Sequence, residues 1–207
     1  MNKNRKIIVL SICIVLILLI GLSADAFADN NNKEPMLKVA DVIRNHVNNN
    51  GADKKISIGD FNGEPIYNDE FDLRYKKAVA MGSDTPYDDT IESIRLLKAE
   101  KQFADENNIS VTQNEVLEYT NSQRDIVDNQ ADADIRNGFK AFISELGMSE
   151  DEYWTEYKLE ENAKYLLHLE VVHYQEKNNI IANELENTPI QITNEAYQKN
   201  NIDFEME

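Results

Sequence analysis

The stretch from residue 150 to about residue 185 contains neither glycine nor proline, the two residues that most often interrupt a helix. Ser149 and Glu152 open it as a capping box, in which each side chain bonds the backbone N–H of the other residue. A single long helix is therefore predicted near the end of the chain. Its large or apolar side chains are Trp154, Tyr157, Leu159, Ala163, Leu166, Leu169, Val172 and Tyr174.

Other helices are predicted upstream by caps and by apolar spacing. Asn68 is the expected cap of one helix, with acidic residues in its first turn. Thr85 is the expected cap of the next, which has Pro86 at its first position and runs to about Asn107. Thr112 and Glu115 form a second capping box. Two more helices are indicated by apolar residues at helical spacing, one over residues 37–47 and one over residues 139–146 before Gly147.

A small β-hairpin is predicted ahead of the helix at Asn68. Ile56, Ile58 and Phe61 alternate as in a strand, Asn62-Gly63 is a turn pair, and a second short strand passes through Pro65-Ile66. The predicted fold class is mainly α, with this one hairpin and the long C-terminal helix. Flexible or irregular segments are expected at residues 29–35 and 128–138, and a helix start at residues 193–197.

The first residues have the pattern of a secretory signal. Basic residues precede an apolar run over residues 7–22, and Ala26-Phe27-Ala28 offers small residues for cleavage. Residues 1–28 are therefore predicted to be a signal peptide or, where it is retained, a membrane anchor. In both cases the rest is expected to lie outside the cytoplasm, secreted or anchored at the outer face of the membrane. The only cysteine, Cys13, lies within this run, so no disulfide is expected in the remainder.

The formal net charge of −17 argues against binding to nucleic acid or to anionic lipid. Basic or unfolded polypeptides are compatible partners. A membrane contact is expected only through residues 7–22.

Motifs for catalysis, metals and cofactors are missing from the sequence. His168 and His173 are five residues apart, which differs from the spacing of zinc-binding histidines on a helix and favours partly exposed helix residues. Asp132 and Asp134 begin like a calcium loop, but Arg136 stands at the next ligand position, so a helix start or a solvated loop is favoured. No catalytic residue, metal ligand or cofactor is predicted.

Several segments, taken in order, resemble the N-terminal domain family of SurA. Residues 61–71 resemble its hairpin pattern V-N-G-x-x-I followed by an acidic helix start. Residues 91–100 are similar to its second helix, residues 108–116 to its G-I-x-V-T-x-x-E-V junction, and residues 146–154 to the G-L-S-E-E-E-Y start of its last long helix. The resemblance spans about residues 56–175.

This resemblance implies an exported chaperone of the SurA-like and PrsA-like kind, which holds unfolded polypeptides in an apolar helical cleft. The implied organisation is a leader and short helix over residues 29–55, the chaperone domain over residues 56–187 and a tail over residues 188–207. Members of the family often carry a parvulin isomerase domain, but the segment after Tyr174 is short and lacks glycine. Isomerase activity is therefore the less favoured alternative, after a helical interaction protein with one dedicated partner.

Large amphipathic side chains on the predicted helices are the candidates for contact with a client. They are Tyr75, Trp154, Tyr157 and Tyr165. The alternative for each is a place in the core, because a small helical domain needs most of its large side chains inside.

Overall fold

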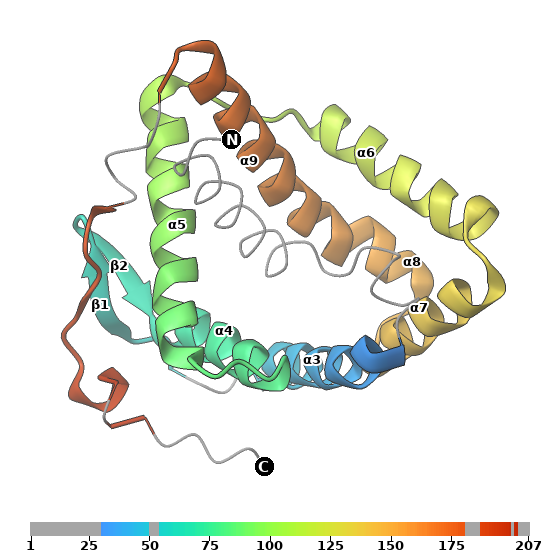
Figure 1. Ribbon diagram of the computed structural model, residues 1–207, viewed down its shortest axis with the longest axis horizontal. Helices are drawn as coiled ribbons and strands as arrows, with labels where there is room; N and C mark the ends of the chain where they lie inside the picture. The colour runs from blue at the N-terminus through green and yellow to red at the C-terminus, as the bar shows by residue number, and fades with distance from the viewer. Residues whose placement is uncertain (1–29, 50–53, 181–186, 200, 203–207) are drawn as a thin grey trace.

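The computed structural model of this protein describes residues 30–49, 54–180, 187–199 and 201–202 (Figure 1). The predicted signal peptide, residues 1–28, lies outside them. The described chain is mainly helical and includes a small antiparallel sheet of three strands, which confirms the predicted fold class. None of its helices is both long and apolar enough to cross a membrane.

The first described helix is longer than predicted. Helix α3 spans Asn30–Asn49 and includes most of the expected leader. Met36, Val39, Ala40 and Ile43 lie on one face of it and are buried in a cluster with residues of α7 (Ala133–Leu146). The prediction of a flexible segment at residues 29–35 is therefore wrong from Asn30 onward, because the helix has a packing partner distant in the sequence.

The hairpin forms as predicted, from β1 (Ser57–Phe61) and β2 (Glu64–Tyr67). Asn62 and Gly63 form its turn, both with positive φ, as a tight hairpin turn requires. Strand β3 (Gln191–Ile192), which was not predicted, pairs with the other side of β1. The expected helix start at residues 193–197 is only the short 3-10 helix η4 (Glu195–Tyr197).

Gly59 marks the place where β3 meets β1. A Cβ atom at this position would lie 2.1 Å from the backbone oxygen of Gln191. Only glycine lets the two backbones approach this closely.

Two of the predicted caps act differently in the structure. Helix α4 (Asn68–Ala80) begins at Asn68, whose side chain accepts a hydrogen bond from the backbone N–H of Ile56 at 2.8 Å instead of capping the helix. Helix α5 (Pro86–Asn107) has Thr85 at its N-cap position, but the Thr85 side chain makes no capping hydrogen bond. The predicted start at Pro86 and end near Asn107 are confirmed.

The segment that follows α5 is helical almost throughout. Helix α6 (Gln113–Asp125) begins with the predicted Thr112–Glu115 capping box and continues into the π-helical turn η1 (Ile126–Gln130). Asp132 then caps α7, which ends at Gly147 as predicted. The prediction of a mobile connection over residues 128–138 is wrong, because η1 and α7 occupy most of it.

The long C-terminal helix is present, but it is shorter than predicted and contains a π-helical segment. The predicted Ser149–Glu152 capping box opens it. It consists of α8 (Glu150–Glu152), the π-helical η2 (Tyr153–Tyr157) and α9 (Lys158–Lys177). It ends near Asn179, whose φ is 55°. Residues 181–186, over which it was expected to continue, lie outside the described residues.

The helices form an open frame instead of one bundle. In Figure 1, α5 forms one side, α4 and α3 form a second side, and α9 forms the third, with α6 along the outer edge of α9. Among the described residues, the buried apolar side chains divide into three clusters at the corners of this frame. The first joins α3, α7 and η2, the second joins the sheet, α4 and α5, and the third joins α5 and α9.

Candidate functional site

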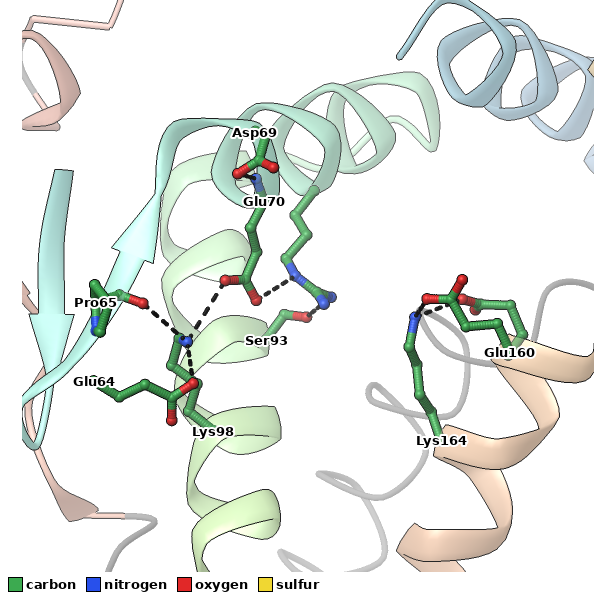
Figure 2. Close-up of polar contacts among 10 residues, drawn as sticks. Glu64, Pro65, Asp69, Glu70, Ser93, Lys98, Glu160 and Lys164 are labelled. Atoms are coloured by element: carbon green, nitrogen blue, oxygen red, sulfur yellow. Dashed lines mark hydrogen bonds and ion pairs between the residues drawn. The ribbon is translucent and has the colours of Figure 1, made fainter. Parts of the chain in front are cut away.

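A network of charged side chains joins the hairpin, α4 and α5 (Figure 2). The Lys98 ammonium donates to Glu64 Oε1 at 3.0 Å and to the carbonyl of Pro65 at 3.2 Å, and it lies 3.7 Å from Glu70 Oε2. Lys98 is only 8% exposed, so these acceptors compensate for the loss of water around its charge. The network fixes the hairpin to α5.

Arg74 continues this network along α4. Its Nη1 donates to Ser93 Oγ at 3.0 Å, and its Nε lies 3.7 Å from Glu70 Oε1. Burial lowers the pKa of Arg74, and the negative charges of Glu70 and Glu161 partly oppose that effect.

Lys77 follows Arg74 by three residues and therefore lies on the same face of α4. Arg74, Lys77 and Ala78 line one wall of a small pocket, and Asp89, Thr90 and Ser93 of α5 line the other. Burial lowers the pKa of Lys77, while Glu161 is the attractive charge that opposes this effect most. The face of α4 that meets α5 thus presents two cations to a common pocket.

The charges of α9 face this pair of helices from the other side of the frame. Lys164 donates to Glu160 Oε1 at 2.8 Å and to Glu161 Oε1 at 3.1 Å. Figure 2 shows Lys164 and Glu160 on α9, apart from the Lys98 network on α4 and α5. The first half of α9 therefore carries charges of both signs, which pair with one another.

The four candidate client-binding residues are divided among different places. Trp154 is only 4% exposed and lies in the cluster formed with α3 and α7, where its ring centroid is 5.4 Å from that of Phe139. Trp154 is therefore a core residue, which was the alternative considered for each candidate. Tyr157 is half-buried against the same cluster, and burial raises its pKa.

Tyr75 and Tyr165 keep more surface than Trp154. Tyr75 is half-buried and stacks on Phe71 with ring centroids 6.0 Å apart. Tyr165 is half-buried on α9, with its ring 5.6 Å from that of Tyr119 on α6. The four candidates therefore do not form one site.

An apolar surface that the sequence did not indicate lies along α6 and α9. Leu117 is 46% exposed and Leu169 is 40% exposed. Leu169 follows Tyr165 by four residues and Asn162 by seven, so it lies on the face of α9 that meets α6. We call Tyr119, Tyr165 and Leu169 the α6–α9 seam, in which Tyr119 meets Tyr165. Leu117, two residues before Tyr119, lies on a different side of α6. The helical spacing of these residues was visible in the sequence, but their exposure depends on where α6 lies.

Polar contacts hold α6 against α9 beside this seam. The buried Asn162 side chain donates to Thr120 Oγ1 at 2.8 Å and to Gln123 Oε1 at 2.9 Å. The pKa of Tyr119 is raised to about 12. Burial is the main cause, and the neighbouring Tyr165 raises it further.

His168 joins α9 to α5, and the expectation of a partly exposed histidine is wrong for it. It is 8% exposed, and its Nδ1 lies 2.7 Å from Glu100 Oε2. His173, five residues later, is exposed. In the described part of the chain no group of histidines and carboxylates is arranged to hold a metal ion, and Asp132 serves as a helix cap.

In comparisons with known proteins, no protein family, no curated protein and no solved structure matches this chain.

Proposed function

We propose that the protein is an exported chaperone of the holdase type, which binds apolar segments of unfolded polypeptides and keeps them from aggregating. The observation that carries the proposal is the α6–α9 seam, where leucine and tyrosine side chains stay exposed or half-buried on a well-formed helix pair. Exposed apolar surface of this kind is typical of interaction sites.

The surrounding charge supports a polypeptide as the partner. Glu118 and Glu170 are exposed on α6 and α9, and the chain as a whole carries −17. Such a surface attracts basic segments and keeps a complex soluble. Export is part of the proposal and rests on the signal-like pattern of residues 1–28.

Binding of this type requires no covalent step. A chaperone that binds only the unfolded client lowers the concentration of free unfolded chains by mass action, and aggregation slows accordingly. Tyr119 and Tyr165 suit this role because aromatic side chains offer large contact area with little conformational freedom to lose.

The test is light scattering of two unrelated, aggregation-prone clients with the full chain present or absent. We expect suppression near stoichiometric amounts for both clients. In the variant Leu169→Ser, suppression should fall at least about fivefold while the circular dichroism spectrum is unchanged, because an exposed residue contributes little to stability.

A matched control is Met81→Ser, which removes an apolar side chain of the same exposed fraction, 40%, away from the seam. This variant should retain full suppression. Failure of the folded protein to protect either client would contradict the proposal and favour the alternative of one dedicated partner. Equal losses in the Leu169→Ser and Met81→Ser variants would show that the seam is not the binding surface.

A further inference from the structure

The pocket between α4 and α5 differs from the rest of the surface in the sign of its charge. Arg74 and Lys77 project from one wall, whereas the chain as a whole is strongly acidic. The one carboxylate in the lining, Asp89, accepts hydrogen bonds from the hydroxyls of Ser83 and Thr85. Asp89 is therefore bound to hydroxyl groups instead of to the two cations of the pocket.

Hydrogen-bond donors in this pocket also lack acceptors. The Nε of Arg74 is buried and faces Glu70 Oε1 at 3.7 Å, a distance too long for a hydrogen bond. Among the described residues, the Lys77 ammonium makes neither a hydrogen bond nor a salt bridge, and only more distant charges act on it. A half-buried ammonium without an acceptor is costly, since it has given up water and gained no replacement.

The two carboxylates near these cations, Glu70 and Glu161, also interact with other lysine side chains. Glu70 lies 3.7 Å from both Arg74 Nε and Lys98 Nζ. Glu161, the acid whose charge most favours the charged form of Lys77, is itself 3.1 Å from Lys164. The local positive charge is thus only partly compensated.

The size of the pocket limits what enters it. Its interior has room for about one water molecule, and it is open on one side. A single oxygen atom fits, with the remainder of the group outside. Ser93 and Thr90 on the α5 side of the pocket already use their hydroxyls, since Ser93 accepts from Arg74 and Thr90 donates to the carbonyl of Pro86 at 2.7 Å.

We propose that this pocket binds a carboxylate group of a polypeptide, with one carboxylate oxygen entering between Arg74 and Lys77. A carboxylate supplies the acceptor that the Lys77 ammonium lacks and places a negative charge beside Arg74, and charge-assisted hydrogen bonds of this kind are stronger than neutral ones. The site is separate from the α6–α9 seam and does not depend on the proposed chaperone function.

The first experiment is an NMR titration of the full chain with sodium acetate at about pH 7 and constant ionic strength, with acetamide as the uncharged counterpart. We expect saturable shifts of the Thr90 and Ser93 amide signals with acetate and none with acetamide. Absence of saturable shifts with acetate, or equal shifts with acetamide, would overturn the proposal.

Variants assign the effect to the pocket. Lys77→Gln should weaken acetate binding about tenfold, the scale of one charge-assisted hydrogen bond. Lys77→Arg keeps the charge and should bind within about threefold of the original chain. Lys76→Gln makes the same change at an exposed position of α4 and should leave binding unchanged. Binding that survives Lys77→Gln would contradict the assignment.

Two peptides then identify the source of the carboxylate. One carries a single internal glutamate and an amidated end, and the other has a free C-terminal carboxylate and no acidic side chain. Binding of the first assigns the pocket to acidic side chains, and binding of the second assigns it to chain ends. If neither peptide competes with acetate, the polypeptide ligand is excluded. Light scattering tests a different surface, so failure of one proposal is distinguishable from failure of the other.

Discussion

The helix pairs α4–α5 and α6–α9 bury very different side chains. At the first corner, Phe71 and Ile94 are fully buried together with Phe61 of the hairpin. In the second pair, the buried positions of α6 are Val116 and Thr120, and the buried partner on α9 is Asn162. At the first corner, buried aromatic and aliphatic area adds to the contacts of Lys98 and Arg74, while in the second pair hydrogen bonds set the position of α6.

This difference has a functional interpretation. A pair held by apolar packing hides its large side chains, as α4 and α5 hide Phe71. A pair positioned by a few polar contacts leaves room for leucine and tyrosine at its surface, as at Leu117 and Leu169. The same contrast separates the regions expected to determine stability from the region proposed to bind clients.

The largest expected effect is at the α4–α5 corner. Phe71→Ala should lower the free energy of unfolding by about 3–5 kcal/mol, because it leaves a cavity in a fully buried cluster. Urea denaturation followed by circular dichroism measures this value. Tyr165→Ala in the α6–α9 pair should cost only about 1–2 kcal/mol, since its ring is half-buried. Equal costs for the two variants would remove the contrast between the pairs.

A smaller effect is expected at Asn162. Asn162→Ala removes the hydrogen bonds to Thr120 and Gln123 and should cost about 1–3 kcal/mol. Asn129→Ala, an exposed position in η1, is the control and should change stability by less than about 0.5 kcal/mol. Chemical denaturation of both variants gives the comparison. A cost at Asn162 no larger than at Asn129 would show that the polar contacts do not position α6.

The smallest effect is a pH dependence. The pKa of Tyr119 is raised to about 12 in the folded protein, above its ordinary value of 10.0. Folding therefore favours the neutral phenol: this contribution is complete below pH 10.0 and is lost as the pH rises toward about 12. Burial raises the pKa of Tyr153 and Tyr157 in the same direction.

Thermal unfolding at several pH values between about 9 and 11.5 measures this loss. The variant Tyr119→Phe should show a shallower decline than the original chain, because it lacks one of the titrating groups. Identical slopes for the two proteins would exclude Tyr119 as a contributor.

Local signals predicted the elements that depend on neighbouring residues. Both capping boxes, the Asn62-Gly63 turn, the start at Pro86 and the end at Gly147 are confirmed. Each depends on residues within one turn, so the sequence contains the whole interaction.

Features that depend on distant partners were missed. Helix α3 extends over the expected leader because it packs on α7, and β3 forms because β1 has a free edge at Gly59. Asn68 bonds Ile56 instead of its own helix because the hairpin lies beside it. Periodicity along one helix carries no information about such contacts.

The candidate site shows the same division. Tyr75, Trp154, Tyr157 and Tyr165 were chosen by residue type, and type alone does not distinguish Trp154 in the core from Tyr165 near the surface. Arg74 and Lys77 are ordinary residues of a helix in the sequence. They acquire a pocket only when α5 packs against α4.

The π-helical segment η2 allows one continuous helix to serve several neighbours. Each extra residue in a helical turn rotates the rest of the helix by about 100°. Tyr153 and Trp154 point into the cluster with α3 and α7, while Asn162 faces α6 and Val171 faces α5. The wider turn thus determines in which directions the side chains of α9 point relative to those of Tyr153 and Trp154. Shortening η2 by one residue would restore regular winding and turn Asn162 and Val171 away from their partners, so the geometry of the whole frame depends on a local insertion.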